Sequence, residues 1–317
     1  MTASRWLSLS ALGYASFALA GAGLIRRHES QPLDDVGVPG QLTDVDGVRI
    51  HYVESGSGPP TLLIPGFGAS TFSFRETIPA LSPRSRVVAI DLPGFGYSDR
   101  GDEHDYSSSG QADIVARFMR QQGLQDAVVL GHSLGGGVAL RLAERHPDLV
   151  SRLVLVGSID PNEQLLGRPV ALLLRLVLPL LGAGVGLARI FSRRTMQRAV
   201  YDPAFVTPAV LRGYDAPTRV RGSHAALLRI ILGFATDAPA HLGSISVPTL
   251  LLWGDADRIV PLEIGRGLLE RIPDARLEVL PETGHLPLEE RPAAANAVLL
   301  RWLEETENAP SGGSARV

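Results

Sequence analysis

The chain has 317 residues, of which 45% are hydrophobic and 20% charged, so it can form one large folded domain with a substantial core and is too apolar to be disordered. Its formal net charge of -3 argues against nucleic acid as a general partner. It contains no cysteine, which excludes disulfides, thiolate catalysis and cysteine-ligated metals, and its 30 basic residues are all arginine, which excludes lysine-based chemistry.

An uncharged apolar stretch covers residues 6–25, with arginines flanking it at both ends. At about 1.5 Å per residue, a helix of this length would span about 30 Å, the thickness of the hydrocarbon core of a bilayer. We therefore expect residues 1–28 to anchor the chain in a membrane through a single segment. The alternative is a signal peptide, cleaved near the small-x-small sequence at 18–20, with export of the protein. The flanking arginines leave the side of the membrane open.

Residues 29–40 are typical of a linker, and alternating strands and helices follow. Asp46-Gly47 predicts the turn of a hairpin over Gln41–Glu54, because it separates two runs with period-two alternation. Short runs of branched apolar residues predict buried strands at 61–64, 87–90, 127–130, 153–156, 249–253 and 277–280. Amphipathic spacing predicts helices over 109–122, 134–146 and 293–305, and residues 308–317 are typical of a flexible tail.

Strands that alternate with helices at this spacing predict an α/β fold. We expect a mainly parallel eight-stranded sheet with helices on both faces, formed by residues 41–160 and 241–307. In such sheets, active residues collect at the carboxyl ends of the strands. The loops that follow the strands are therefore where a site is expected.

The sequence Gly131-His132-Ser133-Leu134-Gly135 lies between a predicted strand and a predicted helix, and it has the form G-x-S-x-G. In this context the motif predicts a nucleophile elbow. Side chains at the two glycine positions would collide with the neighbouring strand and helix. The turn would push the Ser133 hydroxyl out above the sheet, at the positive end of the new helix.

A serine hydroxyl is a poor nucleophile unless a base takes its proton. Of the eight histidines, His285 is the candidate base, because it follows the last predicted strand in a loop that can return over the elbow. His132 adjoins Ser133, and we expect it to be structural or to form a pocket wall.

A carboxylate usually holds such a histidine in the right tautomer. Asp257, in the loop after the penultimate strand, is the candidate. Asp255 lies nearer the end of that strand and is a fallback that would otherwise turn the loop. Asp160, just past the strand at 153–156, is a second fallback.

The order Ser, Asp, His on alternating β and α elements resembles the α/β-hydrolase fold superfamily. The likeness covers about residues 41–305. The motifs that carry it are Gly-Phe-Gly at 66–68, Asp-x-Pro-Gly-x-Gly-x-Ser at 91–98, Gly-His-Ser-Leu-Gly-Gly at 131–136, Trp-Gly-x-x-Asp-x-x-Val-Pro at 253–261 and Gly-His at 284–285. Together these motifs are specific to the superfamily and not to a substrate.

The resemblance implies an oxyanion hole made by the backbone N–H groups of Phe67 and Leu134, and it implies no cofactor and no metal. Relatives often have His-Gly where this chain has Pro65-Gly66, but the donor lies one residue later, so we expect the hole to survive. An inserted helical cap is also implied, here residues 161–240. Its leucine-rich face would roof the cleft or lie on anionic lipid.

We therefore expect a membrane-tethered serine hydrolase, similar to esterases and lipases, that cleaves carboxylic esters of apolar acyl chains through an acyl-enzyme. The substrate would be a small apolar ester or a lipid. Alternatives within the superfamily are C–C bond hydrolysis and cofactor-free haloperoxidase chemistry. A binding protein on an inactive scaffold is the alternative from another class. The complete set of Ser, Asp and His favours an enzyme.

Overall fold

The structure is a computed structural model of the chain, and it describes residues 25, 27–35, 37, 39–162 and 192–308. Most of the predicted N-terminal anchor, residues 163–191 of the predicted cap and the tail beyond 308 lie outside these residues. Within the described part of the chain, no helix combines the length and the apolar character that crossing a membrane requires.

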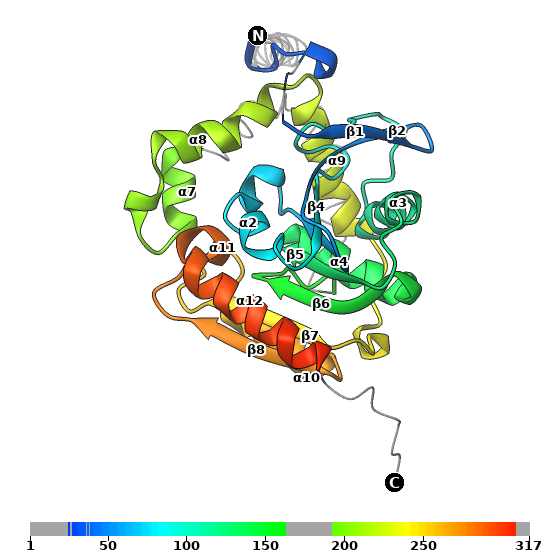
Figure 1. Cartoon of the computed structure of the whole chain (residues 1–317). Coiled ribbons are helices and arrows are strands. Elements are labelled where there is room, and N and C mark those ends of the chain that lie inside the picture. Colours follow the sequence, from blue (N-terminus) through cyan, green and yellow to red (C-terminus); the bar gives the residue numbers. More distant parts are fainter. Residues whose placement is uncertain (1–24, 26, 36, 38, 163–191, 309–317) are drawn as a thin grey trace, which may run out of the picture.

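An eight-stranded sheet in the order β1-β2-β4-β3-β5-β6-β7-β8 forms the centre of the molecule (Figure 1). β2 pairs antiparallel with β1 and with β4, and every other neighbouring pair is parallel. The strands are β1 (Gln41–Val45), β2 (Val48–Ser55), β3 (Pro60–Ile64), β4 (Arg86–Ile90), β5 (Ala127–His132), β6 (Val150–Val156), β7 (Thr249–Gly254) and β8 (Ala275–Leu280). The predicted α/β fold with a mainly parallel eight-stranded sheet is confirmed.

The two kinds of strand pair follow from local sequence. Asp46 (φ 52°) and Gly47 (φ 84°) both adopt the left-handed conformation that a tight two-residue hairpin turn needs, so β1 and β2 pair with Val45 opposite Val48. β5 lies in the middle of the sheet, and each of its six residues is buried. This is expected where a parallel strand is covered on both faces.

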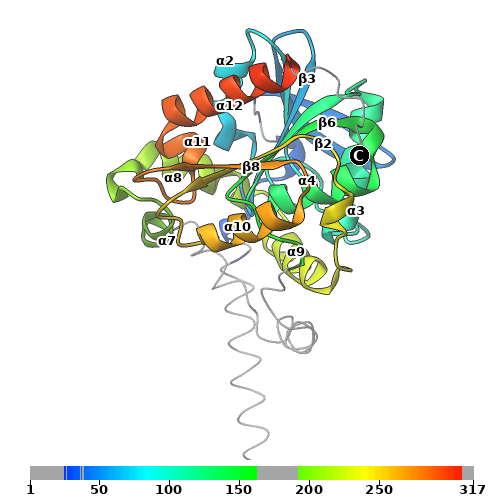
Figure 2. The same ribbon diagram turned by 90° about the horizontal axis from the view of Figure 1, so that it is seen from below.

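Helices cover both faces of the sheet (Figure 2). Because successive strand residues point to opposite faces, Leu62 of β3 joins one apolar layer and its neighbour Leu63 joins the other. The Leu62 layer includes residues of α3 (Ser108–Gln121), α4 (Leu134–Arg145) and α10 (Leu262–Arg271). The Leu63 layer includes residues of α2 (Ile78–Leu81), α11 (Pro287–Glu290) and α12 (Pro292–Glu307).

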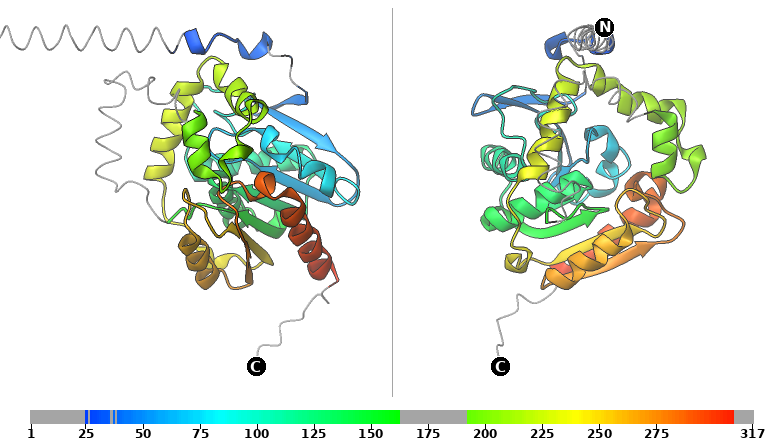
Figure 3. Two further views of the ribbon diagram at one scale, coloured as in Figure 1. Left: turned by 90° about the vertical axis from the view of Figure 1, so that its left-hand side faces the viewer. Right: turned by 180° about the vertical axis from the view of Figure 1, so that it is seen from behind.

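Between β6 and β7 the chain makes a long excursion, and we call residues 192–248 of this excursion the insertion. Its α-helices are α7 (Arg193–Ala199), α8 (Pro208–Asp215) and α9 (Ser223–Thr236), drawn in yellow-green to yellow (Figure 3). Met196, Val210 and Tyr214 of the insertion share an apolar cluster with Ala69 and Leu286, which lie in the loops after β3 and β8. The insertion therefore packs on loops that follow the carboxyl ends of the strands.

Candidate active site

Ser133 lies in a sharp turn between β5 and α4, with φ 52° and ψ -118°. This is a strained backbone for a residue with a side chain. A Cβ on Gly131 would lie 2.4 Å from the carbonyl oxygen of Gly135, and one on Gly135 would lie 2.4 Å from that of Ile64. Only glycine fits at both positions, because the turn brings strand and helix backbones into direct contact.

The hydroxyl of Ser133 meets the imidazole of His285, with Oγ 3.0 Å from Nε2. The other ring nitrogen, Nδ1, lies 2.8 Å from Oδ2 of Asp257. An ionised carboxylate only accepts, so Nδ1 carries the proton and Nε2 is left to accept from the serine hydroxyl. The three residues come from the loops after β5, β8 and β7, and all three are buried.

The structure brings one of the three candidate carboxylates to the histidine. Oδ1 of Asp257 accepts the N–H groups of Ile259 and Val260, both at 2.9 Å, which leaves Oδ2 for His285. Asp255 is exposed and accepts the N–H of Thr283, so it braces its own loop. The third candidate, the buried Asp160 at the end of β6, forms an ion pair with Arg271 of α10.

The turn after β3 lies directly against the elbow, since a Cβ on Gly66 would be 3.0 Å from Cβ of Ser133. Among the described residues, neither the N–H of Phe67 nor that of Leu134 has a hydrogen-bond acceptor. Leu134 is the first residue of α4, where backbone donors have no partner within the helix. These two N–H groups, in the turn after β3 and at the start of α4, stay the predicted donors of an oxyanion hole.

The residue before the serine holds the histidine loop. Nε2 of His132 donates to the backbone carbonyl of His285 at 2.8 Å. Burial and the nearby imidazole of His285 lower the pKa of His132 to about 4, so its ring is neutral at ordinary pH. A neutral ring with Nε2 protonated suits a carbonyl partner.

Sequence reasoning missed Glu290, whose carboxylate braces the same loop from the other side. It accepts the N–H groups of Gly284 (3.1 Å) and Leu286 (3.0 Å), the two neighbours of His285. It also accepts the N–H of Tyr201 in the insertion at 2.7 Å. The signal that could have revealed it is an acidic pair at 289–290, a few residues after the predicted base.

The neighbouring Glu289 joins the insertion to the core. Its carboxylate is buried, forms an ion pair with Arg75 and accepts the hydroxyl of Tyr214 from α8. Burial raises the pKa of Glu289. A buried charge with two partners is costly to disrupt, so this contact holds α8 firmly on the core.

A hydroxyl that is hydrogen-bonded to an oriented imidazole, beside two free N–H donors, is an arrangement suited to nucleophilic attack on a carbonyl carbon. Among the described residues, no group of three or more His, Asp or Glu side chains is placed to hold a metal ion.

Comparison with known proteins gives the family. The model of the alpha/beta hydrolase fold matches residues 59–292, and the chain belongs to this family.

Among relatives, an uncharacterized hydrolase of Bacillus subtilis is 32% identical, over 78% of this chain and 92% of that protein. A 2-hydroxymuconate semialdehyde hydrolase of a Pseudomonas species is 31% identical, over 83% of this chain and 93% of that protein. Two solved structures, each 26% identical, are also similar. A meta-cleavage product hydrolase covers 84% of this chain and 98% of its own with a TM-score of 0.70, and a membrane phospholipase A covers 96% and 97% with a TM-score of 0.69.

Proposed function

We propose that this protein is a serine hydrolase that cleaves carboxylic esters of apolar acyl chains. The observation that carries the proposal is the hydrogen-bonded series from Ser133 through His285 to Asp257. In this mechanism, Ser133 Oγ attacks the ester carbonyl while His285 takes its proton and then returns it to the leaving alcohol. Asp257 keeps Nδ1 of His285 protonated and stabilises the imidazolium that forms.

The negative charge that develops on the carbonyl oxygen needs donors. We assign this role to the N–H groups of Phe67 and Leu134, which have no other acceptor among the described residues. Loss of one such donor typically costs about 2.7–4 kcal/mol of barrier. Water then attacks the acyl-enzyme with His285 as base, which releases the acid and restores Ser133. None of these steps calls for a cofactor.

The extent of the similarity to one solved structure supports a lipid-like ester as the substrate. The membrane phospholipase A covers 96% of this chain, against 84% for the meta-cleavage product hydrolase. The apolar sequence at 6–25 supports a tether through residues 1–28. In this proposal, residues 161–240 form the cap over the site, and the chain acts on amphiphilic substrates near a membrane surface.

C–C bond hydrolysis is the second candidate. Two observations favour it: the similarity to the 2-hydroxymuconate semialdehyde hydrolase extends over 93% of that protein, and the meta-cleavage product hydrolase has the same fold. The same serine and histidine would serve both reactions, so the substrate distinguishes the two candidates.

The decisive experiment compares wild type with Ser133→Ala on nitrophenyl esters of graded acyl length and on 2-hydroxymuconate semialdehyde. We expect ester hydrolysis that depends on Ser133 and rises with acyl length. Turnover of the semialdehyde alone would support the second candidate, and ester rates that are flat and independent of Ser133 would discard the first. Failure of a fluorophosphonate to label wild type near neutral pH would instead indicate a binding protein.

A further inference from the structure

The insertion carries an excess of positive charge. Residues 192–248 include seven arginines and three acidic residues, a balance of +4, whereas the whole chain carries -3. The three acids already accept hydrogen bonds from other residues: Asp202, Asp215 and Asp237. Four exposed arginines make no side-chain hydrogen bond or ion pair among the described residues, and we call them the unpaired arginines: Arg194, Arg198, Arg212 and Arg221. These four cations have no counter-charge in the described part of the chain.

Three of the unpaired arginines lie on the sides of α7 and α8 that face away from the core. Met196 is the buried residue of α7, and Arg194 and Arg198 lie two positions to either side of it, which is about 200° around the helix. In α8, Arg212 lies midway between the two buried residues, which are four positions apart. The apolar sides of both helices pack together in one cluster with residues of the core. Their arginine sides are therefore left for another surface.

The segment that follows the apolar sequence at 6–25 is bound to the insertion beside the fourth unpaired arginine. Gln31 forms a parallel bridge with Val220. Its backbone N–H donates to the carbonyl of Arg219, and its carbonyl accepts the N–H of Arg221. Val220 is buried, whereas the side chain of Arg221 is exposed. Arg221 therefore lies at the surface where the N-terminal segment meets the insertion.

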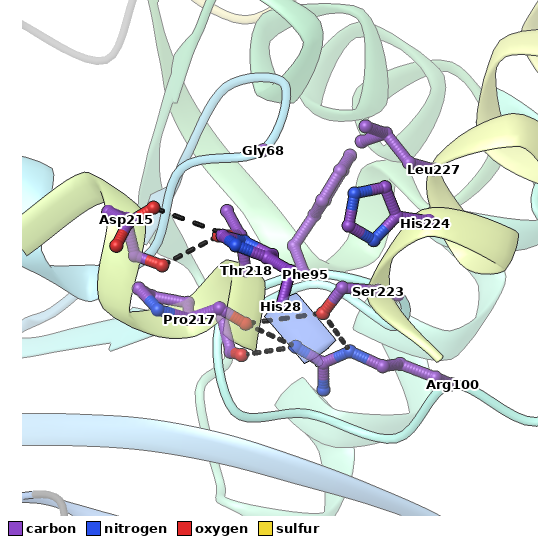
Figure 4. Close-up of a pocket in the computed structure, with 12 residues that line it drawn as sticks. His28, Gly68, Phe95, Arg100, Asp215, Pro217, Thr218, Ser223, His224 and Leu227 are labelled. Carbon is purple, nitrogen blue, oxygen red and sulfur yellow. Dashed lines mark hydrogen bonds and ion pairs between the residues drawn. The ribbon is translucent and has the colours of Figure 1, made fainter. Parts of the chain in front are cut away.

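Side chains fix the same segment to the insertion. Nε2 of His28 donates to Oγ1 of Thr218 at 2.8 Å, because the proton of that hydroxyl goes to a backbone carbonyl (Figure 4). The carboxylate of Glu29 accepts the backbone N–H groups of Gly222 (2.9 Å) and His224 (2.6 Å). Gly222 caps α9 without a side chain, so Glu29 supplies the acceptor that the first turn of this helix lacks. A stretch that the sequence indicates only as a linker is therefore held firmly on the insertion.

The short length of chain between the apolar sequence and these contacts limits where a membrane can lie. Only Arg26 and Arg27 separate Ile25 from His28, and a fully extended chain covers about 10 Å over that interval. The headgroup layer on one side of a bilayer is about 5–8 Å thick. A bilayer that holds residues 6–25 must therefore lie close to the insertion.

We infer that the side of the insertion that carries the unpaired arginines docks on the headgroups of anionic phospholipids. Their phosphates supply the negative charge that the described chain lacks. Tyr201, just after α7, is exposed and is of a residue type enriched at membrane interfaces. The inference rests on the proposed tether for the position of the bilayer and goes beyond it, because it names the protein surface and the class of lipid. Since the insertion packs on the loops that carry the candidate site, docking holds that site close to the lipids.

The test measures how accessible α8 is to water on two kinds of vesicle. Full-length Ser133→Ala protein, which has no cysteine of its own, receives Ala209→Cys at an exposed position of α8 and a fluorophore there. It is reconstituted into phosphatidylcholine alone or into equal parts of phosphatidylcholine and phosphatidylglycerol, and acrylamide quenching reports the docked fraction. Each arginine near an anionic surface contributes about fivefold, so the ratio of docked to free insertion should be at least about 10²-fold larger with phosphatidylglycerol. High salt should reverse this gain, because it screens exposed charges.

Replacing all four unpaired arginines with glutamine should abolish the difference between the two lipid compositions. The matched control changes the net charge equally by replacing four exposed arginines outside the insertion, and it should behave as the parent protein: Arg84, Arg117, Arg120 and Arg301. A label at Gln125→Cys, an exposed position just before the amino end of β5, should be quenched equally in both lipids. Thermal unfolding shows that each variant is folded.

Equal quenching at position 209 on neutral and anionic vesicles would overturn the inference, and so would protection that survives loss of the four arginines. Flotation of the vesicles separates this inference from the proposed tether. Protein that floats only with anionic vesicles, and only with its arginines intact, would refute the tether and support the docking surface. Neither readout needs turnover, so a failure of the proposed ester hydrolysis is seen separately.

Discussion

The ring of His132 donates to the backbone carbonyl of His285 across 2.8 Å, so the residue before Ser133 ties the elbow to the loop that carries the imidazole. This contact is separate from the one between the Ser133 and His285 side chains. Two hydrogen bonds thus join the two loops. One runs from the His132 ring to the backbone of His285, and the other joins the side chains of Ser133 and His285, which we propose react. Burial and the nearby imidazole of His285, rather than this hydrogen bond, keep the ring of His132 neutral.

Stability should fall at mildly acid pH because of this ring. The pKa of His132 is lowered to about 4 in the folded chain, whereas the unfolded chain takes up the proton near 6.5. The unfolded state therefore binds more protons between these values, and folding loses free energy as the pH falls. We expect a loss of about 2 kcal/mol from this group between pH 8 and pH 5.

Urea unfolding at the two pH values measures this loss. His132→Gln keeps a donor for the carbonyl of His285 and removes the titration, so its stability should depend less on pH than that of wild type. His28, whose pKa is also lowered, acts in the same direction in both proteins and cancels in the comparison. Identical pH dependence of the two proteins would contradict the assignment.

The choice of carboxylate is tested by a matched pair of variants. Asp257→Asn should lower kcat by about 10⁴-fold, because the amide favours the wrong tautomer of His285. Asp255→Asn, only two residues away and exposed, should retain most of the activity. Steady-state kinetics with a nitrophenyl ester measures both, and comparable losses in the two variants would show that Asp257 is not the orienting group.

Gly157, directly after β6, should prove sensitive for a geometric reason. Its φ is +47°, and a Cβ there would lie 3.2 Å from Oδ2 of Asp257 and 3.3 Å from Nδ1 of His285. Gly157→Ala should therefore displace this pair and lower kcat by about tenfold or more, as small displacements of reacting groups do.

The control for Gly157 is Gly123→Ala. Gly123 has φ +66° and nothing within 4 Å of the added Cβ, so it carries the same kind of backbone strain with no neighbour to displace. Both variants should lose about 1 kcal/mol of stability or more in chemical denaturation. Only Gly157→Ala should lose activity, and equal activity in the two variants would argue against a role for that contact.

Glu290 should act as a positioning residue. Its carboxylate accepts the N–H groups on both sides of His285, so Glu290→Ala leaves buried donors unpaired and should cost about 1–3 kcal/mol of stability. The imidazole should also be less well placed, which lowers kcat more than it changes KM. Glu282→Ala, at an exposed residue paired with Arg291, is the control. A stability loss with unchanged kcat would restrict Glu290 to a structural role.

Much of the fold was readable from the chain itself. Branched apolar runs such as Thr61–Ile64 can be buried on both faces only as central strands, and Asp46-Gly47 has the conformational freedom that a tight turn requires. The glycines on either side of Ser133 likewise predicted a sharp turn, because the steric limits on such a turn act between residues that are close in sequence. These features depend on interactions between residues that are near one another in the sequence, so they can be predicted from the sequence.

The partners of the site were decided by tertiary structure. The sequence favoured Asp257 and left Asp255 and Asp160 as fallbacks, and only packing shows that Asp257 faces His285 while Asp160 pairs with Arg271. The same holds for Glu290 and for the contact of Glu29 with His224, which joins positions 195 residues apart. Such contacts depend on where whole loops meet in space. The sequence therefore determined the strands, the elbow and the candidate serine, and the folded arrangement determined which carboxylate faces His285.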